Sequence, residues 1–267
     1  KMKRFLSIPV LFALFLLGFV YYVTMFVFLE ESASLHTSTG LIPLAFSLLG
    51  FMCLFSLIVC ILTDPGGVPS VSVPDIEQSY GLENEIKRIG SNTRLCDKCS
   101  VNKPPRAHHC RVCRRCVLKM DHHCIWINNC VGCRNYNAFL LLVFYATLAS
   151  AYSAIIITIS MIKRDWDHAS SQHSKSLHLF CGVLSGSLSF ILGSLLVWHL
   201  YLTSHNMTTI EYHEAKRAAW LASKSGQTYR HPYDAGFYRN ITSVFGPNVL
   251  KWFWPRAVDH VGDGVGF

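Results

Sequence analysis

The stretch LCDKCSVNKPPRAHHCRVCRRCVLKMDHHCIWINNCVGC, from Leu95 to Cys133, holds eight of the eleven cysteines and four of the thirteen histidines of the chain. The pattern C-x2-C-x9-H-x6-C occurs in it twice, and the second copy starts 14 residues after the first. Each copy supplies three thiolates and one imidazole, which complete a tetrahedral zinc site. The predicted ligands are Cys96, Cys99, His109 and Cys116 in one set and Cys110, Cys113, His123 and Cys130 in the other.

The spacing leaves single ligands open to exchange. Cys113 also forms a C-x2-C pair with Cys116, as Cys130 does with Cys133, and each predicted histidine ligand follows a second histidine. Only the 14-residue repeat selects the two sets. The segment has no long hydrophobic periodicity, so a small fold here needs something else to hold it together. Two structural zinc ions are therefore expected.

Three neighbouring residues fall outside both ligand sets. Cys124 lies 14 residues after Cys110, as if it began a third copy, but Ile127 stands where the second cysteine would be. His122 and Asp121 lie beside it. A thiolate is a nucleophile, an imidazole can take the thiol proton, and a carboxylate can orient the imidazole. We predict a catalytic group of these three; the alternative is a spare thiol or exchanged zinc ligand beside a surface carboxylate.

The composition indicates a membrane protein. Charged residues make up 15% of the 267, against about 25% in ordinary soluble domains, and the mean hydropathy is +0.30. Four stretches lack Lys, Arg, Asp and Glu, and each reaches the roughly 20 residues that a membrane-spanning helix needs. They are Phe5–Leu29, Leu41–Leu62, Ala138–Ile162 and Leu177–Thr203. The sequence thus predicts an all-α membrane protein with four transmembrane helices and a loop-rich, cysteine-rich domain holding two zinc sites. Buried helices of a large soluble protein are the weaker alternative.

Basic residues predict the orientation. With both termini and residues 63–137 on one side, that side carries 21 Lys and Arg against three on the other. We therefore expect both termini and the cysteine-rich segment to be cytosolic, where disulfides are rare. The net charge of +8 suits the anionic cytosolic leaflet and anionic substrates, so no nucleic acid partner is expected.

The predicted organisation follows the four spans. Residues 1–62 form the N-terminal tail and the first two spans, and residues 63–137 the cytosolic zinc domain. Residues 138–203 form the last two spans, and residues 204–267 a cytosolic tail.

The sequence Asp121-His122-His123-Cys124, set in its cysteine-rich segment between two spans, resembles the signature of the DHHC family of protein S-acyltransferases. Further motifs agree in order and topology, and the resemblance covers nearly the whole chain. They are DPG (Asp64–Gly66), NNCVGCRNYNAF (Asn128–Phe139), TTIE (Thr208–Glu211) and YDAGFYRNITSVFG (Tyr233–Gly246).

The resemblance implies a role for each residue of the signature. Cys124 would carry the acyl group, with His122 as its base and Asp121 as the residue that orients the base. His123 would belong to the second zinc set, as in the repeat. Thr209 would sit near the active-site acid.

The resemblance also implies supporting roles. Asn240 and Tyr233 would help dock the tail against the membrane helices, and Trp126 would lie near the first carbons of the acyl chain. The usual proline after the signature is replaced by Ile125, which puts the approach of the tryptophan in question. Cys133 has no family role and is interpreted as an exposed bystander or a site of self-acylation.

The predicted function is palmitoyl transfer from acyl-CoA to cysteine thiols of membrane-associated proteins, in the Golgi, the endoplasmic reticulum or the plasma membrane. A basic cluster is placed to bind CoA phosphates, although a solvated face near anionic lipid is an equal interpretation: Arg111, Arg114, Arg115 and Lys119. The main alternative is a membrane-anchored zinc-binding adaptor without catalysis. A transporter is disfavoured because the four spans contain no Asp, Glu, Lys or Arg.

Overall fold

The structure is a computed structural model that describes residues 7–28, 41–68, 94–163 and 172–256. Within these ranges, four helices are long and apolar enough to cross a membrane, which confirms the predicted fold class. They are α2 (Ile8–Tyr22) with its π-helical continuation η1 (Val23–Phe28), α4 (Leu41–Leu62), α6 (Tyr136–Lys163) and α7 (Gln172–Ser204). The predicted N-terminal basic residues and both predicted loops between spans lie largely or wholly outside the described residues.

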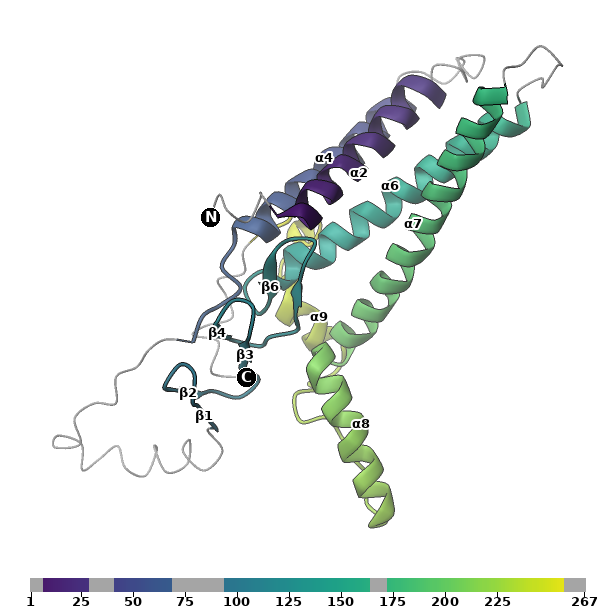
Figure 1. Cartoon of the computed structure of the whole chain (residues 1–267). Coiled ribbons are helices and arrows are strands. Elements are labelled where there is room, and N and C mark those ends of the chain that lie inside the picture. Colours follow the sequence, from purple (N-terminus) through teal and green to yellow (C-terminus); the bar gives the residue numbers. More distant parts are fainter. Residues whose placement is uncertain (1–6, 29–40, 69–93, 164–171, 257–267) are drawn as a thin grey trace, which may run out of the picture. The chain divides into compact units, whose positions relative to one another are not determined.

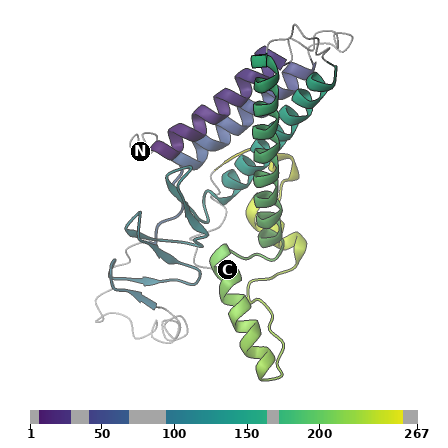
Figure 2. The same cartoon turned by 45° about the vertical axis from the view of Figure 1, so that its right-hand side comes forward.

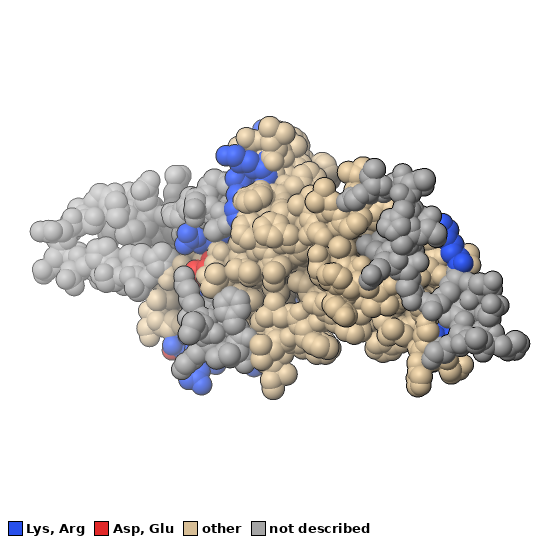
Figure 3. All heavy atoms as spheres, turned by 90° about the horizontal axis from the view of Figure 1, so that it is seen from above, with Lys and Arg blue, Asp and Glu red and all other residues tan. Residues whose placement is uncertain are grey.

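The chain divides into two compact units. One consists of residues 1–61, 138–201 and 253–255, and the other of residues 62–137, 202–252 and 256–267. Figure 3 looks onto a face on which Lys, Arg, Asp and Glu occupy only small patches, as expected of apolar helices. Each unit has its own core of buried side chains.

The first unit is a bundle of the four apolar helices, with α2, α4 and α6 side by side (Figure 1, Figure 2). The ring of Phe46 in α4 stacks on Tyr21 of α2 at 5.6 Å and on Tyr152 of α6 at 5.3 Å. Buried hydroxyls connect three helices: Ser153 Oγ lies 2.7 Å from Thr24 Oγ1 and 3.1 Å from Ser185 Oγ. Such interhelical hydrogen bonds satisfy polar groups where no water is available.

Among its described residues, the second unit contains three short antiparallel β-hairpins, which the sequence analysis did not predict. Their strands are three residues each, too short to show an alternating pattern. They pair β1 (Arg94–Cys96) with β2 (Val101–Lys103), β3 (His108–Cys110) with β4 (Arg115–Val117), and β5 (His122–Cys124) with β6 (Asn129–Val131).

The hairpins share one geometry at a 14-residue interval. Each first strand ends in a cysteine, and a residue with positive φ follows four positions later: Ser100 (53°), Arg114 (53°) and Asn128 (45°). A left-handed residue at that point reverses the chain in a tight turn. The sequence repeat is thus a structural repeat with three copies, although only two carry full ligand sets.

The DPG segment adds to the edge of the second hairpin. Gly66 O accepts a hydrogen bond from Leu118 N at 2.8 Å, and Gly67 forms a β-bridge with Val117. Gly66 has φ 103°, and a Cβ there would lie 2.6 Å from the sulfur of Cys133. The thiol of Cys133 is accordingly buried and donates to Pro65 O at 3.6 Å, so the interpretation of an exposed bystander was wrong.

The tail after α7 folds into α8 (Thr209–Lys224), α9 (Phe237–Phe245) and the short 3-10 helix η3 (Val249–Lys251). Helix α8 begins with a capping box, in which Thr208 and Glu211 each accept a hydrogen bond from the backbone N–H of the other. This arrangement satisfies two donors that a helix start otherwise leaves without partners. It also fixes the first turn of α8.

Candidate metal sites and reactive cysteine

The first predicted ligand set is gathered around His109. Its Nδ1 lies 3.5 Å from the sulfur of Cys96, 3.2 Å from that of Cys99 and 3.9 Å from that of Cys116. A tetrahedral zinc with Zn–S near 2.3 Å and Zn–N near 2.0 Å has S–N edges of about 3.5 Å. The four donor atoms therefore have the separations that such an ion requires.

The second set has the same arrangement around His123. Its Nδ1 lies 3.7, 3.4 and 3.6 Å from the sulfurs of Cys110, Cys113 and Cys130. In both sets the histidine and the last cysteine are directly opposite across a hairpin, since His109 pairs with Cys116 and His123 with Cys130.

The two groups are the ones that the 14-residue repeat selects. The neighbouring histidines and Cys133 belong to neither group. The chain therefore presents two Cys3His groups with the geometry of metal sites.

Cys124 occupies the ligand position of the third hairpin. It ends β5 opposite Asn129, just as Cys96 ends β1 and Cys110 ends β3. Ile127, which is fully buried, takes the place of the second cysteine. Cys124 thus shares the backbone setting of a zinc ligand while lying outside both four-residue groups.

His122 and Asp121 stand beside this thiol as the sequence predicted. His122 Nδ1 lies 2.7 Å from Asp121 Oδ2, and the carboxylate is buried. Burial alone would lower the pKa of His122, but hydrogen bonds to Asp121 and Cys124 and the negative charges of both raise it to about 9. The arrangement favours a protonated His122 held by Asp121 next to the sulfur of Cys124.

Thr209 completes the support of the acid. Its N–H donates to Asp121 Oδ1 at 2.8 Å and its hydroxyl to Oδ2 at 2.9 Å. Both carboxylate oxygens are thereby fixed by the first residue of α8. The proximity implied by the resemblance is present in the structure.

The residues proposed to contact substrate differ in their surroundings. Trp126 is half-exposed, and Arg111 and Arg114 are exposed. Arg115 instead forms an ion pair of 2.7 Å with Asp64 of the DPG segment.

Lys119, the fourth basic residue of the cluster, has a buried ammonium. Its Nζ donates to Asn206 Oδ1 at 2.9 Å, and burial lowers the pKa of Lys119 to about 7. Arg111 and Arg114 are therefore the members of the cluster best placed to meet an anionic ligand.

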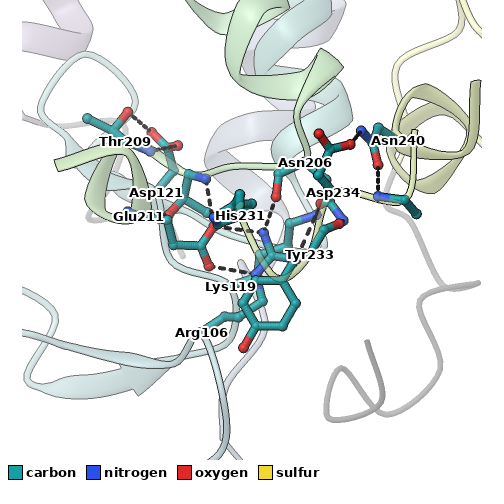
Figure 4. A network of polar contacts seen from close by, with 12 residues as sticks. Arg106, Lys119, Asp121, Asn206, Thr209, Glu211, His231, Tyr233, Asp234 and Asn240 are labelled. Carbon is teal, nitrogen blue, oxygen red and sulfur yellow. Dashed lines mark hydrogen bonds and ion pairs between the residues drawn. The ribbon is translucent and has the colours of Figure 1, made fainter. Parts of the chain in front are cut away.

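The two tail residues lie in one polar network, drawn in Figure 4. Asn240 is buried, and its Nδ2 donates to the carbonyl of Ser204, the last residue of α7, at 2.7 Å. The ring of Tyr233 lies 4.3 Å from the guanidinium carbon of Arg106. Asn240 therefore ties the tail to the end of α7.

Sequence reasoning gave no role to two residues of this network, although one of them, Glu211, closes the TTIE motif. Arg106 and Glu211 form a buried ion pair with a separation of 2.6 Å. The glutamate had a local signal, because Thr208-x-x-Glu211 is a capping-box pattern. The arginine had none, since its partner lies 105 residues away.

Comparison with known proteins agrees with this geometry. A sequence model of the DHHC palmitoyltransferase family matches residues 89–216. The chain is 53% identical over 252 residues to "Probable protein S-acyltransferase 15" of Arabidopsis thaliana, covering 94% of this chain and 98% of that protein. It is 46% identical to "Probable protein S-acyltransferase 16" of the same plant, covering 98% and 92%. With mouse "Palmitoyltransferase ZDHHC15" it shares 38% identity, covering 67% and 52%. The chain therefore belongs to the DHHC palmitoyltransferase family and is a multi-pass membrane protein S-acyltransferase.

Proposed function

We propose that Cys124 carries a long-chain acyl group from acyl-CoA to cysteine thiols of membrane-associated proteins. The observation that carries this proposal is a thiol in the ligand position of a zinc-type hairpin, next to His122 and Asp121 rather than to a second cysteine. The Asp121 carboxylate is buried and hydrogen-bonded on both oxygens beside His122. A thiol without a catalytic role would not need such an arrangement. An adaptor without catalysis would need none of these three side chains.

The first step is thioester exchange. The proton of the Cys124 thiol moves to His122, and the thiolate attacks the carbonyl carbon of the acyl-CoA thioester. A new S–C bond forms at Cys124 as the bond to the CoA sulfur breaks. His122 returns its proton to the departing CoA thiolate, while Asp121 stabilises the charged imidazole in between.

The second step repeats this chemistry with a protein thiol. A cysteine of the acceptor gives its proton to His122 and attacks the acyl-enzyme, and Cys124 leaves and is reprotonated. One thioester is exchanged for another in each step, so the free energies nearly balance. The reaction requires no nucleotide hydrolysis and no redox partner.

The two Cys3His groups would hold structural zinc ions. Three thiolates and one imidazole close the coordination shell and leave no position for substrate. The ions supply rigidity only. Their ligands on β3 to β6 would fix the second and third hairpins, and Met120 and Asp121 connect these hairpins. The ions would thus hold the catalytic side chains in place in a fold that has little core of its own.

The membrane location suits the substrate. Each CH₂ buried in the bilayer is worth about 0.8 kcal/mol, so a long acyl chain stays among the lipid tails. The Cys124 loop is followed closely in sequence by α6, an apolar helix that begins at Tyr136. With the positive-inside orientation, this loop faces the cytosol, and the exposed Arg111 and Arg114 are suited to bind CoA phosphates.

The proposal is tested by labelling the purified protein with acyl-CoA of several chain lengths. We expect hydroxylamine-sensitive labelling that the Cys124→Ser variant abolishes, with two zinc ions retained per chain. Transfer to an acceptor cysteine should be lost in parallel. Labelling that survives Cys124→Ser would refute the assignment of the nucleophile.

A further inference from the structure

We propose that Arg106 is a positioning residue that holds both partners of the Asp121–Thr209 contact. It lies in the connection between the first and second hairpins, and its side chain is fully buried. Its main chain contacts Met120, in the connection between β4 and β5 just before Asp121, and its side chain contacts the start of α8. The proposal rests on the proposed role of Asp121 and extends it to a residue outside the signature.

The main-chain contact is made on the side of the signature. Arg106 O accepts a hydrogen bond from Met120 N at 3.3 Å, one residue before Asp121. Arg106 itself has φ 67°, in the left-handed region that non-glycine residues seldom occupy. This conformation directs its carbonyl to one segment and its side chain to another.

The side-chain contact is a two-point ion pair with Glu211. Arg106 Nε donates to Oε1 at 2.6 Å and Nη2 to Oε2 at 2.8 Å (Figure 4). The guanidinium also donates to Asn206, through Nη1 to the side-chain oxygen at 3.2 Å and through Nη2 to the carbonyl at 2.7 Å. The ring of Tyr233 covers its face. Only a planar fork of donors makes all these contacts at once.

Glu211 connects Arg106 to the first turn of α8 through hydrogen bonds with Thr208. Its Oε2 also accepts the N–H of Thr208 at 2.8 Å, and its own N–H donates to Thr208 Oγ1 at 3.2 Å. These bonds set the first turn of the helix. Thr209 lies between the two capping residues, and its two donors bind Asp121.

The surrounding charges are arranged around one carboxylate. Glu211 lies against Arg106 and within 4.0 Å of His231 Nε2, and Lys119 shares Asn206 with Arg106. Without the Arg106 guanidinium, the buried carboxylate of Glu211 would keep only weaker partners. The first turn of α8 would then be free to shift. A small displacement of Thr209 would release Asp121 and, through it, His122.

A role in stability alone makes a different prediction from a role in positioning. A merely structural ion pair would lower activity by the same factor whether or not Thr209 binds Asp121. A positioning residue acts through Thr209, so its effect should shrink once the Thr209 hydroxyl is gone and only the backbone N–H binds Asp121. Residues that act through a shared network show such non-additive effects.

The experiment is a double-mutant cycle on the full-length protein, with palmitoyl-CoA as the probe. Arg106→Lys keeps the charge but loses the two-point geometry, and Thr209→Val removes the hydroxyl bond. We expect Arg106→Lys to slow formation of the acyl-enzyme on the order of tenfold, with two zinc ions and the KM for palmitoyl-CoA unchanged. In the Thr209→Val background, the same change should have an effect of less than about twofold.

Arg217→Lys is the matched control, because Arg217 is an exposed residue of the same helix, α8. It should leave the rate unchanged. An equal loss of rate in both backgrounds, or no loss, would overturn the positioning role. If Arg106→Lys loses zinc, Glu211→Gln takes its place in the cycle. Zinc loss in both variants would also overturn the proposal. Labelling of the parent protein that withstands Cys124→Ser would instead overturn the proposed function.

Discussion

Thr209 binds both oxygens of the Asp121 carboxylate, with its N–H at 2.8 Å and its hydroxyl at 2.9 Å. One oxygen, Oδ2, also contacts His122 Nδ1 at 2.7 Å. The carboxylate thus has a fixed orientation before any substrate arrives. Fixed dipoles and donors of this kind lower the reorganisation that a charged intermediate would otherwise require.

Removal of the Thr209 hydroxyl should slow acyl-enzyme formation. Thr209→Val keeps the backbone bond but loses the bond to Oδ2, so we expect a decrease on the order of tenfold. Thr209→Ser keeps a hydroxyl and should stay close to the parent rate. Rapid-quench labelling with palmitoyl-CoA measures both. Equal rates for the two variants would show that the hydroxyl has no part in catalysis.

Replacement of one ligand should remove one metal ion. Cys113→Ala should lower the zinc content from two ions per chain to one and destabilise the hairpins, because a structural zinc contributes folding free energy directly. Cys124→Ser should keep both ions. Metal analysis of the purified proteins checks the prediction, and a Cys113→Ala variant that retains two zinc ions would contradict the ligand sets.

A cysteine at position 127 should make the reactive thiol sensitive to zinc. Ile127 occupies the place that Cys99 and Cys113 hold in the other hairpins, so Ile127→Cys restores the C-x2-C pair with Cys124. Two thiolates at this spacing bind zinc. We expect added Zn²⁺ to inhibit acyl-enzyme formation in this variant at concentrations that leave the parent protein active.

The control for this variant is Ile127→Val. It is apolar and buried like the parent residue, and should show no sensitivity to zinc. Equal inhibition of the valine and cysteine variants would mean that the third hairpin does not share the ligand geometry of the other two.

The contribution of Glu211 to stability should depend on pH. Burial alone would raise the pKa of Glu211, but hydrogen bonds and charge from Arg106, with the N–H of Thr208, lower it overall. A lowered folded-state pKa gives stability that is complete above the unfolded-state value, near 4.3, and is lost as the pH falls through the folded-state value.

The measurement compares melting temperatures of the parent protein and Glu211→Gln between about pH 3 and pH 7, a range that extends below the unfolded-state pKa. Breaking a buried pair costs on the order of 3 kcal/mol, so the variant should melt several degrees lower at pH 7. The difference should stay nearly constant down to about pH 5 and shrink as the pH falls below the unfolded-state pKa. A difference that stays constant with pH would show that the ionised carboxylate is not what stabilises this region.

The local features of this protein could be predicted because each depends on residues close together in sequence. Uncharged runs of sufficient length mark α2, α4, α6 and α7 whatever their neighbours are. The 14-residue repeat selects the ligand sets because His109 and Cys116, seven residues apart, face each other in one hairpin. The same repeat shows that Cys124 belongs to neither ligand set.

Other features depend on contacts that no local pattern contains. The burial of Cys133 is set by Pro65 and Gly66, 68 and 67 residues upstream. The strands of the hairpins are too short to alternate visibly, and it is the ligand pairs and turns that define them.

The four spans, the two metal sets and the proposal of Cys124 as the nucleophile could all be read from the residues alone, because charge and spacing are local properties. The residues that hold Asp121 in place became visible only in the folded chain. Thr209 meets Asp121 across 88 residues and Glu211 meets Arg106 across 105. A buried charge is costly unless it is paired, so both carboxylates are paired in the fold. The packing of the chain determines which residue is the partner.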